Sequence, residues 1–227
     1  AHIAGILQFM SSAAPTTSSN SDTDNIMLAA RELFCARDDR VLFQNLNFDL
    51  AQGQVLQVQG SNGSGKTTLM RILCGLNDSY EGSIKWHGQE IEDQAASFFS
   101  SLLYIGHRVG VSKVLTPVEN LRWSCSLKQA VSDEQIMAGL KEVGLRGFEE
   151  SPCYTLSAGQ QQRVSLARLI ISPASLWVLD EPFTTLDTKG VAMLEKIMQR
   201  QSQAGGTVMV TTHHSLSIPQ LTILSLG

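Results

Sequence analysis

Eight consecutive residues in the first third of the chain have the types and spacing of a phosphate-binding loop. They match the pattern G-x-x-x-x-G-K-[ST] at every fixed position. Glycines allow a tight turn that brings backbone N–H groups against phosphate oxygens, and a following helix adds the positive end of its dipole. The lysine adds a charge near the β- and γ-phosphates, and the hydroxyl can join the shell of a Mg²⁺ ion. A chance glycine turn is the alternative, but a strand expected before the loop and a helix expected after it favour nucleotide binding. The residues expected to bind the nucleotide are Gly60, Ser61, Asn62, Gly63, Ser64, Gly65, Lys66, Thr67 and Thr68.

A pair of acids follows an apolar run later in the chain. Residues 176–179 are apolar and lead directly into Asp180 and Glu181. In α/β folds, ligand chemistry lies at the carboxyl ends of buried strands. Asp180 is therefore expected to hold Mg²⁺ together with Thr67, and Glu181 to orient and deprotonate a water aimed at the terminal phosphate. A solvated acid pair at a strand end is the alternative, which the phosphate-binding loop makes the weaker one.

Alternating strand and helix patterns supply positions for these residues. Even spacing of apolar residues predicts a strand over 41–50. A helix is expected from Lys66 to Cys74, because Gly75 stops it. The remaining strands are expected over residues 54–59, 83–86, 102–105, 176–180, 207–211 and 222–226. This alternation is typical of an α/β fold.

Three expected helix starts carry capping boxes, in which a hydroxyl and a residue three positions later satisfy each other's backbone N–H groups. The pairs are Thr116 with Glu119, Ser132 with Gln135, and Ser157 with Gln160. The first two lie in a helix-rich stretch between strand-rich parts. We interpret residues from about 112 to 156 as an inserted helical lobe.

Composition excludes several classes of protein. The 227 residues suit one α/β domain, and a net charge of −4 argues against a nucleic-acid partner. No window holds the roughly eighteen consecutive apolar residues that a membrane span needs, so any membrane role is expected to come through a partner. Four cysteines are widely spaced without C-x-x-C, which favours a reducing compartment and small buried thiols, with haem or metal ligation as the alternative.

The first 26 residues differ from the rest. A short apolar start without basic residues runs into a stretch rich in serine and threonine, which is typical of a linker. We expect residues 1–26 to be a disordered extension or an upstream leader, with Met10 and Met27 as alternative starts. Residues 27–227 are expected to form a single domain.

A second motif narrows the function. Residues 156–160, Leu-Ser-Ala-Gly-Gln, followed by Gln-Gln-Arg, resemble the LSGGQ signature of ABC ATPases. One departure is Ala158 in place of the first glycine, a change between small residues. The resemblance covers residues 27–227. It implies a P-loop NTPase core of mainly parallel sheet, an antiparallel β subdomain and an inserted helical lobe.

The resemblance also implies a homodimer that binds two ATP molecules. In it, Ser157, Gly159 and Gln160 of one copy would grip the γ-phosphate of the ATP held by the other copy's loop. The N-terminus of the helix that follows Ser157 suits an anion.

Further roles follow from position in the family pattern. His213 stands at the position of the catalytic switch histidine, with His214 as the weaker alternative. His107 stands where the family usually has a glutamine, and we count it among the catalytic residues. Arg37 stands where an aromatic residue usually stacks on adenine, and its guanidinium plane can stack on a base. The alternatives are that Phe34 makes this contact or that adenine is held loosely.

Within the family, residues 34–40, 103–107, 156–169 and 177–187 resemble the ATP-binding subunits of the cytochrome c maturation system. The resemblance implies an ATPase bound peripherally to the cytoplasmic face of the inner membrane. Its partners would be integral-membrane subunits that serve haem delivery to c-type cytochromes, by haem transport or by release of a haem chaperone. The alternatives are a cassette of another small-molecule transporter and a soluble ABC ATPase such as one for iron–sulfur cluster assembly.

Overall fold

The computed structural model describes residues 25–38, 40–126, 130–219 and 221–227. The strands in these ranges are β1 (Ile26–Arg37), β2 (Arg40–Ala51), β3 (Val55–Gly60), β4 (Glu81–Trp86), β5 (Gln89–Glu90), β6 (Leu102–Ile105), β7 (Leu176–Asp180), β8 (Thr207–Thr211) and β9 (Leu221–Leu226). The α-helices are α1 (Lys66–Leu73), α2 (Ala95–Ser101), α3 (Pro117–Ser126), α4 (Asp133–Glu142), α5 (Ala158–Leu166), α6 (Arg168–Ile171) and α7 (Thr188–Gln203). Short 3₁₀ turns cover Ile91–Gln94 and Cys153–Thr155. The prediction of disorder before residue 27 lies almost wholly outside the described residues, and Ile26 begins β1.

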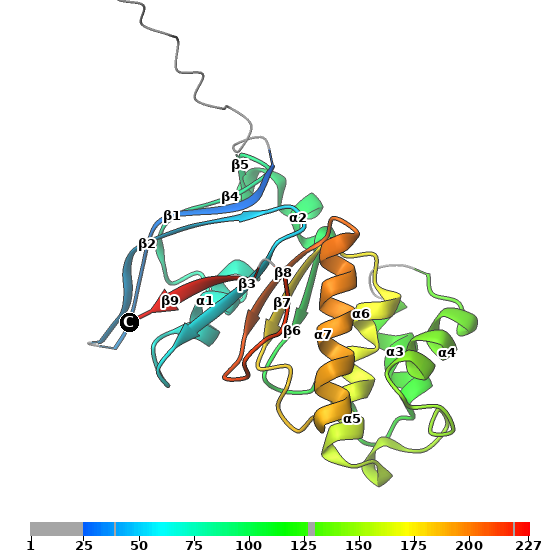
Figure 1. Ribbon diagram of the computed structural model, residues 1–227. Coiled ribbons are helices and arrows are strands. Elements are labelled where there is room, and N and C mark those ends of the chain that lie inside the picture. The colour runs from blue at the N-terminus through cyan, green and yellow to red at the C-terminus, as the bar shows by residue number, and fades with distance from the viewer. Residues whose placement is uncertain (1–24, 39, 127–129, 220) are drawn as a thin grey trace, which may run out of the picture.

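Five strands form a parallel sheet in the order β6-β7-β8-β3-β9 (Figure 1). Helices cover both faces of such a sheet, so its inner strands read as continuous apolar runs rather than as alternating ones. All five residues of β7 and of β8 are buried. This arrangement places the carboxyl ends of β3, β7 and β8 side by side at one edge.

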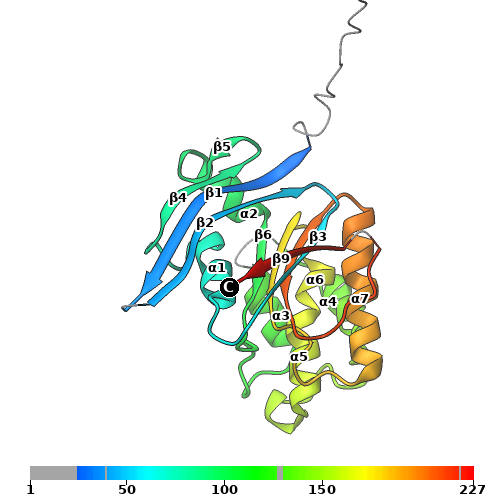
Figure 2. The ribbon, with the colours of Figure 1, turned by 60° about the vertical axis from the view of Figure 1, so that its left-hand side comes forward.

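A second sheet of four antiparallel strands, β2-β1-β4-β5, lies on the side of the parallel sheet that carries α1 (Figure 2). Leu28 of β1 and Phe48 of β2 pack in one core with Met70 of α1 and Val178 of β7. The expected combination of a mainly parallel sheet and an antiparallel sheet is confirmed.

The other face of the parallel sheet packs against the remaining helices. Trp177 of β7 and Val210 of β8 share a core with Val164 of α5 and Leu194 of α7. Helices α3 and α4 lie beyond α5 and α6, on the side away from the antiparallel sheet (Figure 1). These two helices fall within the stretch, about 112–156, for which the sequence predicts an inserted lobe, and that division stays a prediction.

All three predicted capping boxes form. Thr116 and Glu119 bond reciprocally at 2.8 and 3.2 Å, ahead of α3. The pair before α4, Ser132 and Gln135, and the pair before α5 are likewise complete in both directions. Local sequence therefore sets where these helices begin.

Candidate functional site

The predicted phosphate-binding loop connects the carboxyl end of β3 to α1. A Cβ at Gly60 would lie 2.5 Å from the backbone oxygen of Leu226 and from Oγ of Ser64, and the φ of Gly60 is 154°, so only glycine fits. The Nζ of Lys66 donates to the backbone oxygens of Gly60 at 2.7 Å and of Ser61 at 3.0 Å. Both acceptors belong to the loop, so the ammonium group folds back onto it.

Asp180 stands at the end of β7 and is 1% exposed. Its Oδ1 accepts hydrogen bonds from Oγ1 of Thr211 at 2.7 Å and from Oγ1 of Thr67 at 3.3 Å. Its Oδ2 is buried without a hydrogen-bond partner among the described residues, an arrangement that is costly unless a cation or water binds there. Burial, and secondly the charge of Asp180, raises the pKa of Tyr104 on β6 to about 12, so this phenol stays protonated near the carboxylate.

Glu181 follows in a left-handed backbone conformation, with φ of 53°. Its N–H donates to the backbone oxygen of Thr211 at 3.1 Å and to Oγ1 of Thr211 at 3.0 Å, and these bonds fix the peptide. Nε2 of His213 lies 3.6 Å from Oε1 of Glu181. Nε2 of His214 lies instead 3.7 Å from Oε1 of Glu195 on α7. The contact with Glu181 favours His213 over His214 as the histidine of the site.

These groups lie around one cavity of about 1020 Å³. Six of the nine residues predicted to bind the nucleotide line it, namely Asn62, Gly63, Gly65, Lys66, Thr67 and Thr68. Asp180, Glu181, His107 and His213 line it as well, which brings together both acids and both predicted histidines. Gly60, Ser61 and Ser64 belong to the loop but are not among the lining residues.

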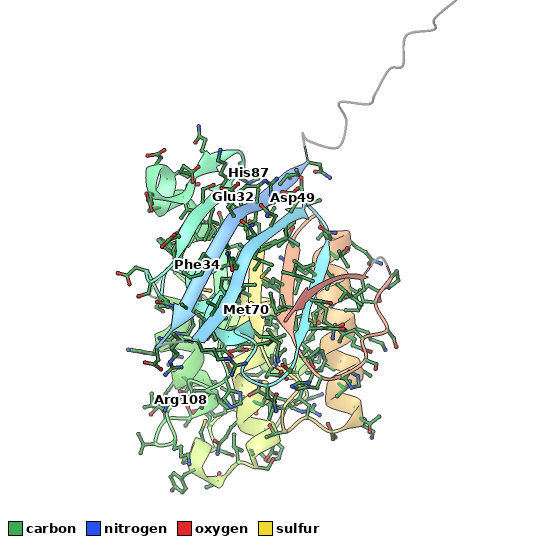
Figure 3. All side chains as sticks on the ribbon, turned by 90° about the vertical axis from the view of Figure 1, so that its left-hand side faces the viewer. Glu32, Phe34, Asp49, Met70, His87 and Arg108 are labelled. Atoms are coloured by element: carbon green, nitrogen blue, oxygen red, sulfur yellow. The ribbon has the colours of Figure 1, made fainter. Side chains whose placement is uncertain are left out.

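The two candidates for the adenine contact differ in position. Arg37 lines the cavity at the end of β1, next to the lining residues Cys35, Ala36 and Asp38. Phe34 lies on the same strand in the antiparallel sheet (Figure 3). It is not among the residues that line the cavity. The geometry favours Arg37, whose role stays a prediction.

The signature residues Ser157, Gly159 and Gln160 do not line this cavity. Oγ of Ser157 accepts from the N–H of Gln160 at 3.2 Å, which leaves the proton of the hydroxyl available for another acceptor. A Cβ on Gly159 would lie 2.8 Å from the backbone oxygen of Thr185, so this position requires glycine. Ala158 is exposed, which explains why a side chain is accommodated there.

Arg163 on α5 ties the signature helix to two neighbours. Its Nη2 lies 2.5 Å from Oδ1 of Asp187, the N-cap of α7, and its Nη1 donates to the backbone oxygen of Val143 after α4 at 3.0 Å. The N–H of Gly190 and, secondly, the Arg163 guanidinium hold the pKa of Asp187 below its ordinary value. Helices α4, α5 and α7 therefore meet at one side chain.

Sequence reasoning missed several residues of the site. Thr211 bridges both acids through one hydroxyl, and Arg71, Asn77 and Thr184 line the cavity. Thr211 could have been found only from the parallel register of β7 and β8, which places it opposite Asp180. That register cannot be derived before the strand order is known.

A model of the ABC transporter family matches residues 43–184. The chain therefore belongs to the ABC transporter family, and within it to the ATP-binding, ATP-hydrolysing subunits. Solved structures agree on the fold: an ATP-binding subunit of an ABC transporter aligns with a TM-score of 0.76 at 23% identity, covering 88% of this chain and 85% of that one. An ABC transporter ATP-binding protein from Pyrococcus furiosus aligns with a TM-score of 0.77 at 23% identity, covering 88% of this chain and 96% of that one.

The relatives narrow the family further. The "Cytochrome c biogenesis ATP-binding export protein CcmA" of Hahella chejuensis is 51% identical over 192 residues, which are 85% of this chain and 91% of that protein. The protein of the same name from Vibrio parahaemolyticus is 47% identical over 204 residues, which are 88% of this chain and 100% of that protein. The resemblance stated from the sequence is thus confirmed. Within the described residues, no helix combines the length and the apolar character needed to cross a bilayer.

Proposed function

We propose that this chain binds and hydrolyses Mg-ATP in the cavity described above and drives membrane subunits of a system for c-type cytochrome biogenesis. The observation that carries the proposal is the convergence of the loop lysine, both acids and His213 on one cavity. Its volume suits a ligand of nucleotide size. The names of the relatives support the pathway.

The donor set around Asp180 fits Mg²⁺. Thr67 and Asp180 offer the oxygen ligands that this ion prefers, and the unpartnered Oδ2 of Asp180 leaves room for it or its water shell. When bound, Mg²⁺ would neutralise charge on the phosphate oxygens. Lys66 and the N-terminus of α1 would add positive charge on the other side of the phosphates.

Glu181 is the proposed general base. Its carboxylate would take a proton from water as the water oxygen attacks the γ-phosphorus, the bond to the bridging oxygen breaks, and ADP leaves. His213, 3.6 Å away, would orient the same water and the γ-phosphate. His107 lines the cavity from the loop after β6, where it would sense the nucleotide and pass its state towards the helices α3 and α4.

Two copies would complete each site. Ser157, Gly159 and Gln160 lie outside the cavity of their own chain, so an ATP held by the loop of one copy would meet the signature helix of the other. The free hydroxyl proton of Ser157 and the N-terminus of α5 suit the γ-phosphate. ATP would then close the dimer, and hydrolysis would reopen it.

The membrane subunits would be those that deliver haem to c-type cytochromes, and the chain would act at the cytoplasmic face of the inner membrane. Affinity purification from membranes tests this. Recovery of cytochrome c maturation subunits is expected. Recovery of unrelated permeases would favour another small-molecule transporter. Recovery of soluble iron–sulfur assembly proteins would favour a soluble ABC ATPase that serves cluster assembly.

Replacing Glu181 with glutamine tests the chemistry. Glu181→Gln should keep ATP affinity and reduce turnover by about 10²- to 10⁴-fold, because only the proton acceptor is lost. Glu150→Gln, at an exposed glutamate that does not line the cavity, is the control. Retention of more than about a tenth of the turnover would remove Glu181 from the role of base.

Complementation tests the shared site. Lys66→Ala and Ser157→Arg should each abolish turnover, whereas mixing them should restore roughly a quarter of it, because half of the dimers are mixed and each carries one intact site of two. A mixture as inactive as its components would refute the exchange of signature helices between copies.

A further inference from the structure

Gln57 is a polar side chain in the middle of a buried parallel strand. It lies on β3 between β8 and β9, opposite Val210 and Ile223, and is 3% exposed. Burying an amide is costly unless it is hydrogen-bonded, so its partners explain its presence.

Those partners flank His213. Nε2 of Gln57 donates to the backbone oxygen of Thr212 at 3.2 Å and to the backbone oxygen of His214 at 3.3 Å. The two hydrogens of one amide therefore hold the residues on either side of the histidine. Gln57 itself does not line the cavity.

The segment that carries His213 needs such a restraint. β8 and β9 are parallel to β3, so the chain after Thr211 has to cross β3 to return to the start of β9. The first part of this crossover, residues 212–219, contains no helix or strand, and His213 is 64% exposed in its side chain. On its other side, Oε1 of Glu195 on α7 accepts from the N–H of Ser217 at 3.0 Å. The crossover is thus anchored between α7 and β3.

We propose that Gln57 is a positioning residue for hydrolysis: it fixes the crossover so that His213 faces Glu181 and the γ-phosphate. Because Gln57 precedes Gly60 by three residues on the same rigid strand, it also sets the position of His213 relative to the phosphate-binding loop. A change in the distance between the loop and His213 would then require this strand to move or these two bonds to break. The inference rests on the proposed role of His213.

The test uses the full chain and compares Gln57→Leu with His213→Ala and with the double variant. Leucine keeps much of the volume and removes both donors. The kcat of Gln57→Leu should fall by about 10- to 100-fold, since small displacements of reacting groups cost that much, while the KM for ATP changes less than about twofold. The double variant should be no slower than His213→Ala, because residues that act through one another are not additive.

Gln54→Leu is the matched control. Gln54 stands just before the same strand and also makes two hydrogen bonds, to the N–H of Ala51 at 2.9 Å and to Oγ1 of Thr222 at 2.6 Å, neither in the crossover. It should share any loss of thermal stability and keep wild-type kcat. If Gln57→Leu does not fold, Gln57→Met, a flexible side chain of equal reach, replaces it.

Unchanged kcat in Gln57→Leu, or losses that add in the double variant, would overturn the inference while leaving the ATPase site intact. Wild-type turnover in His213→Ala would overturn the proposed role of His213 and this inference with it. If the kcat of Gln54→Leu fell as much as that of Gln57→Leu, the role of Gln57 would be structural only, and the inference would be wrong.

Discussion

Thr211 offers a test of how the two acids are held. Its single hydroxyl donates to Oδ1 of Asp180 at 2.7 Å and accepts from the N–H of Glu181 at 3.0 Å. Thr211→Val keeps the shape of the side chain and removes both bonds. Glu181 retains its bond to the backbone oxygen of Thr211, so the loss falls chiefly on the buried carboxylate of Asp180.

The magnitude follows from that loss. A hydrogen bond to a charged group contributes about 2 kcal/mol. In a domain of this size, roughly 3 °C of Tm corresponds to each kcal/mol, so the Tm without nucleotide should fall by about 6 °C. If the shifted Asp180 also loses about 2 kcal/mol of its proposed interaction with Mg²⁺ in the transition state beyond what it loses in the ground state, turnover falls by roughly 30-fold.

Thr207→Val is the control on the same strand. Thr207 is also fully buried, but its Oγ1 donates to a neutral acceptor, the backbone oxygen of Ala51, at 3.1 Å. This bond contributes about 1 kcal/mol, so a Tm loss of roughly 3 °C with normal turnover is expected. Differential scanning calorimetry and a phosphate-release assay measure both. Equal Tm losses and equal turnover in the two variants would refute the bridging role of Thr211.

Two further predictions concern the signature helix. Gly159→Ala should destabilise the protein by about 1–3 kcal/mol in urea unfolding, because the new Cβ would lie 2.8 Å from the backbone oxygen of Thr185. Ala158→Gly should cost about 1 kcal/mol or less. Similar losses of stability in the two variants would contradict the close contact at Gly159. Because the N–H of Gly190 and the guanidinium of Arg163 lower the pKa of Asp187 in the folded state, the stability from this carboxylate is complete above the ordinary aspartate pKa and is lost as the pH falls through the lowered one. Asp187→Asn keeps an N-cap side chain without the charge. Its free energy of unfolding, measured by urea titration, should therefore fall less between about pH 5 and pH 2 than that of the wild type. An identical fall in the two proteins would contradict the stabilising role of the Asp187 carboxylate.

Local patterns in the sequence predict much of this fold. The capping boxes at Thr116, Ser132 and Ser157 need only residues three apart, and all three form. The predicted phosphate-binding loop and the pair of Asp180 and Glu181 are equally local patterns, since each consists of neighbours in the sequence. Such features depend little on the rest of the molecule.

Features that depend on strand order are beyond this reasoning. Gln57 has apolar neighbours on both sides in the sequence, a pattern that indicates a half-exposed strand, yet β3 lies between β8 and β9 and Gln57 is buried. Its two acceptors lie about 155 residues away in the sequence, separated from it by most of the domain. The contact between Thr211 and Asp180 likewise arises only when β7 and β8 pair in parallel. Position in the sheet, rather than local pattern, decides which polar residues are retained inside.

The left-handed backbone at Glu181 has a consequence for protein engineering. Glu181 has a φ of 53°, a conformation that glycine and asparagine adopt with less strain than glutamate. Selection for stability alone would therefore replace this glutamate. Glu181→Gly is expected to raise the melting temperature and, because it removes the proposed general base, to end turnover. With Glu181 as the proposed general base, thermostability and catalysis would select different amino acids at this position, and screens that reward heat resistance without measuring phosphate release would enrich inactive protein.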